Sequence, residues 1–361
     1  MISPRWFAVV LLALCVRLAP GAEAEPVVFG KETLPPLPNG AFTVVVVPDT
    51  QSYRGRGCKA TPDSTDPVTN ENLAAQVEWI LKHRDDQNIV FVSHVGDIVD
   101  RNTVDQWAVA KQQLDKLRGI VPFGLTVGNH DMTSKGDARL FQQHFPASSF
   151  REYPWYLGCY EHDRADQNVS TNNVNSAQTF AAGGRRFLVI HLECNAPDDV
   201  LAWADDVMRK NSEKHVLVTT HMDLGIVEHP QSPEGYIRDP KGRMRWVKIN
   251  GARGNNGEQL WEKLFRNHAN LKLICCGDQS RVTALRLTSV GDAGNPVPSL
   301  LSDYQSQPVL RLMRFGPEEN RVHVLTYDVE QSVLVERTKY VADVNQHQFT
   351  LDYSPGAASS R

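Results

Sequence analysis

The stretch VVVVPDTQ, residues 44–51, joins four consecutive valines to a polar tip. An unbroken run of β-branched residues is typical of a strand that is buried on both faces, and the proline ends that run. Asp49 and Gln51 therefore come directly after a predicted core strand. One polar tip can be an ordinary turn, so its meaning depends on how the other predicted strands end.

Apolar strands alternate with amphipathic helices through most of the chain, which predicts a sheet covered by helices on both faces. The predicted strands after the first are 88–95, 121–127, 185–192, 215–220 and 271–276. The predicted helices are 71–84, 198–210, 257–268 and one that begins near Asn102. In the helix at 71–84, the apolar face consists of Leu73, Val77, Ile80 and Leu81. In the helix that begins near Asn102, it consists of Val104, Trp107, Ala110, Leu114 and Leu117.

The pattern changes from about Arg281 onward. The segments VLRLMRF, 309–315, and RVHVLTY, 321–327, alternate apolar and polar residues and predict antiparallel strands. No linker separates this portion from the rest, so a single large domain is expected. SAQTFAAGG, 176–184, is typical of a hairpin arm that leads into the strand at 185–192.

Four other predicted strands also end in polar residues. They are followed by GDIVD (96–100), GNHD (128–131), His221 and GDQS (277–280). In α/β sheets, ligands bind beyond the carboxyl ends of the strands, so these tips are expected to meet at one crevice. Carboxylate, amide and imidazole groups are ligands for divalent metals. The pattern therefore predicts that Asp49 and Gln51 belong to a metal site.

The ordered motifs resemble those of the calcineurin-like metallophosphoesterases. That family carries Asp-x-His, Gly-Asp-x-x-Asp, Gly-Asn-His-Asp or -Glu, a later His and Gly-His-x-His, each at a strand end. GDIVD and GNHD match in order, about thirty residues apart, and the resemblance runs from roughly 42 to 327. It implies an α/β (α+β) fold in which two β-sheets form a sandwich flanked by helices, an αββα architecture.

The resemblance also implies metal ligands. Asp97 would bridge two divalent ions, because one carboxylate can offer an oxygen to each. Asp49 would bind the first ion, and Asn129 and His221 would bind the second. Read singly, DTQ (49–51) could be an ordinary turn, Asn129 and Asp131 could cap a loop, and Asp100 could cap the helix that begins near Asn102.

Two family positions differ in this chain. Gln51 replaces the histidine of the first motif, and GDQS places Asp278 and Ser280 where two histidines are expected. Asp278 is a plausible ligand of the second ion, whereas the Ser280 hydroxyl is a poor donor. GDQS could also be an ordinary turn that points away from the site. One or two ions of Mn, Mg, Fe, Zn or Ca are expected, and the oxygen-rich set favours Mn, Mg or Ca over Zn.

The implied catalytic residues lie in the same motifs. His130 would face the leaving-group oxygen as general acid, and Asp100 would hold its ring by a hydrogen bond. Arg101 would grip phosphate, as the arginine at this position does in the protein serine/threonine phosphatases. His94 and His191 lie within predicted strands and are expected to be core histidines with hydrogen-bond partners, not ligands.

The expected activity is metal-dependent hydrolysis of a phosphodiester or a small phosphomonoester. The alternative is a binding protein on the same scaffold whose depleted site no longer catalyses. The formal net charge of −4 gives no indication of a nucleic-acid partner. The segment 225–256 is locally basic, and it is either a lid over an anionic substrate or a solvated surface loop.

The N-terminus predicts export. Arg5 precedes the apolar run 7–16, which is too short to span a bilayer and is interrupted by Arg17, so no stable membrane anchor is expected. Small residues predict signal-peptide cleavage after Ala24 and a secreted or periplasmic protein. The expected segments are a signal peptide (1–24), a lead-in (25–41), the phosphoesterase domain (42–330) and a C-terminal strand and tail (331–361).

Export would place the cysteines in an oxidising compartment. Cys275 and Cys276 lie in an apolar strand and are expected in the core. Cys58 and Cys159 lie in loop-like sequence and are the best candidates for a disulfide.

Overall fold

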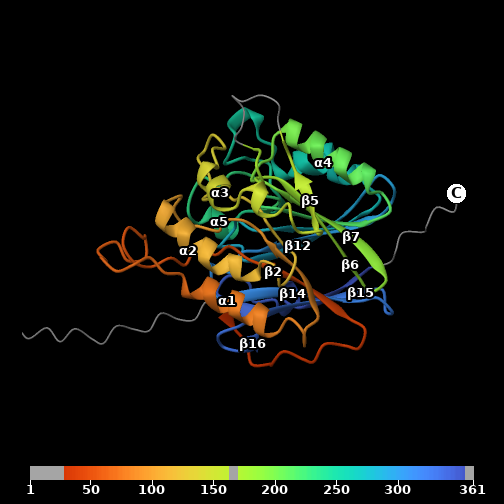
Figure 1. Cartoon of the computed structure of the whole chain (residues 1–361), viewed down its shortest axis with the longest axis horizontal. Helices are drawn as coiled ribbons and strands as arrows, with labels where there is room; N and C mark the ends of the chain where they lie inside the picture. The colour runs from red at the N-terminus through yellow and green to blue at the C-terminus, as the bar shows by residue number, and fades with distance from the viewer. Residues whose placement is uncertain (1–27, 162–169, 354–361) are drawn as a thin grey trace, which may run out of the picture.

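Two seven-stranded sheets pack face to face in the computed structural model, which describes residues 28–161 and 170–353 (Figure 1). The predicted two-sheet sandwich flanked by helices is confirmed. The first sheet has the order β16 (Val333–Leu334), β15 (Arg321–Asp328), β14 (Val309–Gly316), β2 (Phe42–Val47), β3 (Ile89–His94) and β4 (Phe123–Leu125), with β18 (Phe349–Asp352) paired to β15. The second has the order β12 (Ala284–Val290), β13 (Pro296–Ser302), β11 (Leu271–Cys276), β8 (His215–Thr220), β7 (Arg185–Leu192), β6 (Ser176–Ala182) and β5 (Tyr156–Cys159).

Strand β2 explains the run of valines. Val44 and Val46 face the core between the two sheets, together with Phe187 and Leu217 of the second sheet. The alternate valines of β2 pack under the helices on the outer face. Burial on both faces removes the need for polar alternation, and each buried valine contributes about 1.5–3 kcal/mol through its apolar area.

The helices cover the two outer faces of the sandwich (Figure 1). The first sheet packs against α1 (Glu71–Lys82) and α2 (Val104–Leu114), and the second against α4 (Asp198–Lys210) and α6 (Gly257–Lys263). One predicted core residue is wrong: Val104 is 60% exposed, because it is the first residue of α2 and lies before the turn that meets the sheet.

The C-terminal strands are partly as predicted. The hairpin β14–β15 is antiparallel, and β14 joins the first sheet beside β2. The hairpin β6–β7 is also present, and its turn residues Gly183 and Gly184 have φ values of 54° and 71°. However, β13 runs parallel to β11, because β12 takes the outer position and turns back into it. The prediction of purely antiparallel pairing after Arg281 is therefore wrong.

Shorter elements complete the described chain. The lead-in contributes β1 (Val28–Phe29), which pairs with β17 (Arg337–Thr338). After β8 come β9 (Leu224–Ile226), α5 (Gly235–Arg238) and β10 (Lys241–Arg243), with α3 (Arg139–His144) earlier in the chain.

The predicted signal peptide and its cleavage site lie outside the described residues. Within 28–161 and 170–353, no helix has the length and apolar character needed to cross a bilayer.

The predicted disulfide is wrong. Cys58 is buried beside α2, where its thiol contacts the carbonyl of Arg56 and accepts a hydrogen bond from Gln106. Cys159 lies on β5, the edge strand of the other sheet, and its thiol donates to Glu161. Both thiols are free because Cys58 packs in the core of the first sheet and its helices, whereas Cys159 lies on β5 of the second sheet. Cys275 and Cys276 are buried in β11, as predicted.

Candidate metal centre

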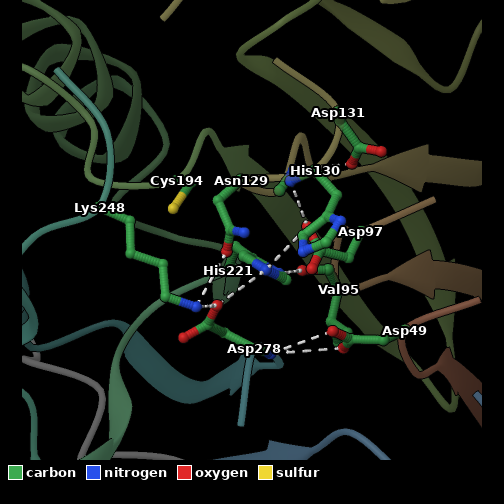
Figure 2. Close-up of polar contacts among 12 residues, drawn as sticks. Asp49, Val95, Asp97, Asn129, His130, Asp131, Cys194, His221, Lys248 and Asp278 are labelled. Carbon is green, nitrogen blue, oxygen red and sulfur yellow. Dashed lines mark hydrogen bonds and ion pairs between the residues drawn. The ribbon is translucent and has the colours of Figure 1, made fainter. Parts of the chain in front are cut away.

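Five strand tips meet at one edge of the sandwich (Figure 2). Asp49, Asp97 and Asn129 follow β2, β3 and β4, which run parallel in the first sheet. His221 and Asp278 follow β8 and β11, which run parallel in the second sheet. Each sheet therefore delivers its carboxyl end to the same place, as strand-tip ligand binding requires.

The two sheets are connected directly through these tips. The backbone N–H of Asp278 donates to both carboxylate oxygens of Asp49, at 3.4 and 3.3 Å. The backbone N–H of Gly277 donates to the carbonyl of His221 at 3.0 Å. The ring of His221 in turn donates from Nδ1 to the carbonyl of Val95 at 2.9 Å. The Asp49 carboxylate and the His221 ring are thus held before any ligand arrives.

The glycines of the motifs allow this close approach. Gly96 has a φ of 103°, and a Cβ there would lie 2.7 Å from Nδ1 of His221. A Cβ on Gly128 would lie 2.2 Å from the backbone nitrogen of Asp97. Asp97 and Asp278 themselves have left-handed φ values of 50° and 78°. Such backbone is costly for residues with side chains and is typical of functional sites.

Asp49, Asp97 and His221 form a buried cluster that could hold a metal ion. One ligand atom of each lies within 4.8 Å of the others. Because Nδ1 of His221 donates to Val95, Nε2 is the ring atom that faces the acids of the cluster. Nε2 is buried 3.1 Å from Oδ1 of Asp97 and 3.5 Å from Oδ1 of Asp278, and the described chain donates no hydrogen bond to it. Without a metal ion, a proton on Nε2 balances these carboxylates. A divalent metal ion can take the place of that proton, so these residues fit a divalent metal.

The charges of the cluster also favour a bound divalent cation. Burial alone lowers the pKa of His221, but the Asp97 carboxylate raises it well above its ordinary range. Burial and the neighbouring Asp303 carboxylate raise the pKa of Asp49. Burial, Asp278 and Asp97 raise the pKa of Asp303 to about 7. Buried carboxylates this close together are costly when ionised, and a divalent cation relieves that cost.

Asp303 is a member of the site that sequence reasoning missed. It is buried and follows β13, so it reaches the cluster by the same strand-tip rule as the other acids. Its Oδ1 accepts the backbone N–H of Gln305 at 3.1 Å. Recognising Asp303 required both a strand at 296–302, which was not predicted, and its parallel pairing with β11.

Gln51, Asp278 and Ser280 stand where the family has histidines, and the three differ from one another in their contacts. The amide nitrogen of Gln51 donates to Oδ2 of Asp97 at 2.7 Å, so Gln51 supports the carboxylate with its N–H group. The Asp278 carboxylate points into the site and contacts His221 and the ammonium of Lys248. Ser280 is exposed and lies outside the cluster.

Lys248 is a second residue that was not predicted as part of the site. Its Nζ bonds Oδ1 of Asp278 and lies 3.4 Å from Oδ1 of Asn129. Burial lowers the pKa of Lys248, but the Asp278 carboxylate outweighs this and raises it above the ordinary value, so the side chain is charged. Lys248 comes from the basic segment 225–256, about thirty residues before Asp278 in the chain.

The rest of that segment is neither wholly a lid nor wholly a solvated loop. Arg243 is buried and paired with Asp223, and the Trp246 indole donates to the carbonyl of Ile226 at 2.9 Å. The other basic residues of the segment lie exposed on its outer side: Arg238, Lys241, Arg245 and Arg253.

His130 lies at the mouth of the site. Its backbone N–H donates to Oδ1 of Asp97 at 2.8 Å. Its ring Nδ1 donates to the backbone carbonyl of Asp100 at 2.7 Å, so Asp100 holds the ring through its main chain. The Asp100 carboxylate lies 3.9 Å from the ring and pairs with Lys59 at 2.6 Å. The His130 side chain is 34% exposed and can meet a substrate. Arg101 follows on the surface.

His94 and His191 are buried core histidines. Nε2 of His94 lies 3.0 Å from the Thr50 hydroxyl, and Nδ1 accepts the N–H of Gly96. The His191 ring contacts Ser93 and Gln178. Burial lowers the pKa of both rings to about 3, so they stay neutral.

Asp131 links the GDIVD and GNHD motifs through hydrogen bonds. Its buried carboxylate accepts the backbone N–H groups of Ile98, Val99 and Gly128, at 3.1, 3.0 and 2.8 Å. One carboxylate therefore links GDIVD to GNHD, and Asp131 acts as a positioning residue that was predicted only as a possible loop cap.

We expect Asp131→Ala to lower the free energy of unfolding by about 3 kcal/mol or more, because three buried N–H groups lose their acceptor. Urea unfolding followed by circular dichroism measures this. Asp85→Ala is the matched control, since the Asp85 side chain is 86% exposed, and it should change stability by no more than about 0.5 kcal/mol. Equal stability of the two variants would contradict the role of Asp131.

Comparison with known proteins agrees with the geometry. The family model described as calcineurin-like phosphoesterase matches residues 42–282. A Bacillus subtilis (strain 168) relative, the uncharacterized protein YvnB, is 24% identical over 345 residues. That match covers 91% of this chain but only 23% of YvnB, so the chain spans about a quarter of the length of this relative.

Solved structures show weaker similarity. The 5'-nucleotidase precursor from Thermus thermophilus aligns with a TM-score of 0.45 and 12% identity, covering 82% of this chain and 53% of that one. The calcineurin-like phosphoesterase YfkN from Bacillus subtilis aligns with a TM-score of 0.41 and 13% identity, covering 86% and 95%. The family match spans well over half of the sequence and contains all five strand tips, and the chain belongs to the calcineurin-like phosphoesterase family.

Proposed function

We propose that this protein is an exported metal-dependent hydrolase of phosphodiesters or small phosphomonoesters. The observation that carries the proposal is the buried cluster of Asp49, Asp97 and His221, in which Nε2 of His221 faces carboxylate oxygens. Export rests on the predicted signal peptide at 1–24.

The proposed cofactor is a divalent ion held by Asp49, Asp97 and His221. When bound, such an ion acidifies a water molecule and neutralises charge on a phosphoryl group. The donor set of two carboxylates and one imidazole favours Mn, Mg or Ca more than a histidine-rich set would, while Fe and Zn can also use it. Asp278 and Asn129 lie beside this cluster, where both contact the ammonium of Lys248.

His130 is the proposed general acid. Because Asp100 accepts the hydrogen on Nδ1, Nε2 is the other proton site of the ring. In the imidazolium form, Nε2 carries the proton that passes to the leaving-group oxygen. The backbone of His130 is fixed to Asp97, so the ring keeps a constant position relative to the metal ligands. The exposed Arg101 is proposed to contact the phosphate from the surface side.

Hydrolysis of bis-p-nitrophenyl phosphate and p-nitrophenyl phosphate tests the proposal. After chelation and dialysis, the purified protein should be inactive, and added Mn²⁺, Mg²⁺ or Zn²⁺ should restore activity. The preferred ester distinguishes diesterase from monoesterase. Undiminished turnover after complete metal removal would contradict a metal-dependent reaction.

A second candidate is a binding protein with a weakened catalytic site. It is favoured by Gln51, whose N–H group faces Asp97, and by Ser280, which lies outside the cluster. Such a protein would bind Mn²⁺ and inorganic phosphate in calorimetric titrations but would hydrolyse neither ester at any metal concentration.

A further inference from the structure

The ammonium of Lys248 contacts Asn129 and Asp278, which stand at positions where the family holds a second metal ion (Figure 2). Its Nζ bonds the Asp278 carboxylate and lies 3.4 Å from the amide oxygen of Asn129. Asp278 and Asn129 come from the tips of strands in different sheets. Lys248 therefore bridges the two sheets through Asp278 and Asn129. The Asp278 carboxylate also lies 3.5 Å from Nε2 of His221.

The main chain of Lys248 is held firmly in this place. Oδ1 of Asn195, which follows β7, accepts the backbone N–H groups of Lys248 at 2.9 Å and Ile249 at 3.2 Å. The flanking side chains of Trp246 and Ile249 are buried. Nζ also lies 5.7 Å from the centre of the Trp246 ring, within the range of a cation–π contact. The lysine side chain is only 28% exposed, so this is not a loose surface residue.

A fixed ammonium and a divalent ion exclude one another at these ligands. Both need the same oxygens of Asn129 and Asp278, and two cations in contact repel strongly where water is excluded. The hydrogen bonds of Lys248 go to Asp278 and Asn129, so the nearby cluster of Asp49, Asp97 and His221 keeps its own ligand set.

We propose that Lys248 is a built-in cation that takes the place of the second metal ion. The site then binds one divalent ion, at Asp49, Asp97 and His221. An ammonium has three N–H groups, and Asp278 and Asn129 use two of them. The third is available to a phosphate oxygen of the substrate, and this part of the inference rests on the proposed phosphoesterase function.

Metal stoichiometry tests the replacement without relying on catalysis. Calorimetric titration of the chelator-treated protein with Mn²⁺, checked by elemental analysis, should give one ion per wild-type chain. Lys248→Met keeps most of the stem but removes the charge, and it should bind two ions. Lys248→Arg keeps the charge and should bind one. Lys241→Met is the matched control, because Lys241 lies exposed in the same segment, and it should also bind one.

Phosphate binding tests the third N–H group. With one equivalent of Mn²⁺, Lys248→Met should bind inorganic phosphate about tenfold more weakly than the wild type, and a second equivalent should restore affinity. Two ions per wild-type chain, or one ion in a folded Lys248→Met protein, would overturn the replacement. Unchanged phosphate affinity would overturn the phosphate contact. Failure to hydrolyse any ester would reject the proposed function and leave the stoichiometry result intact.

Discussion

Asp97→Asn should abolish metal binding and lower hydrolysis by about 10³-fold or more. Asp97 lies within reach of His221, Asp49 and the backbone of His130, so it is central to the cluster. Burial raises its pKa, but the positive charge of His221 more than offsets this, and the net shift is below the ordinary value. The carboxylate is therefore ionised and ready to bind a cation, whereas an uncharged amide is a weak ligand.

We expect this substitution to preserve the fold. Asparagine has nearly the same shape as aspartate and tolerates the left-handed φ of 50° at this position. Metal content and initial rates of bis-p-nitrophenyl phosphate hydrolysis measure the effect, with Asp85→Asn as a control on the exposed surface. A variant that keeps both its metal and its activity would show that Asp97 is not a ligand.

His130→Asn should slow turnover by about 10²–10⁴-fold while leaving metal content unchanged. The substitution removes the proton donor, but the backbone N–H that fixes Asp97 is retained. The loss should be greatest for esters with poor leaving groups, such as phenyl phosphate, because these need protonation more than p-nitrophenyl esters do.

The comparison of leaving groups separates a general acid from a positioning residue. Equal slowing for phenyl and p-nitrophenyl esters would contradict proton donation by His130. Loss of metal would instead place the His130 ring among the ligands. His144→Asn serves as the matched control, because the His144 ring donates to the carbonyl of Leu140 within its own helix and should leave both rates unchanged.

The fold and much of the cluster could be predicted because they follow from local patterns. The valine run of β2 requires burial on both faces, and a buried strand in a parallel sheet points its carboxyl end at a crevice. That rule alone predicts that Asp49, Asp97, Asn129, His221 and Asp278 meet. It missed Asp303 because no strand was predicted at 296–302, and because the direction of β13 depends on its partner β11.

The remaining features depend on contacts between distant parts of the chain. Lys248 stands in a basic segment like its exposed neighbours, and only the packing of Trp246 and Ile249 directs it inward. The contact between Asp100 and His130 was predicted, but the choice of carbonyl over carboxylate follows from the competing ion pair with Lys59. The Cys58–Cys159 pairing was wrong because loop-like sequence carries no information about distance.

The most direct test is crystallographic location of bound manganese. Anomalous diffraction from crystals of the Mn²⁺-loaded protein should show a peak bonded to the carboxylates of Asp49 and Asp97 and to Nε2 of His221, at about 2.0–2.6 Å. Absence of a peak there at saturating Mn²⁺, or a peak held by other residues, would contradict the metal centre on which the proposed activity depends.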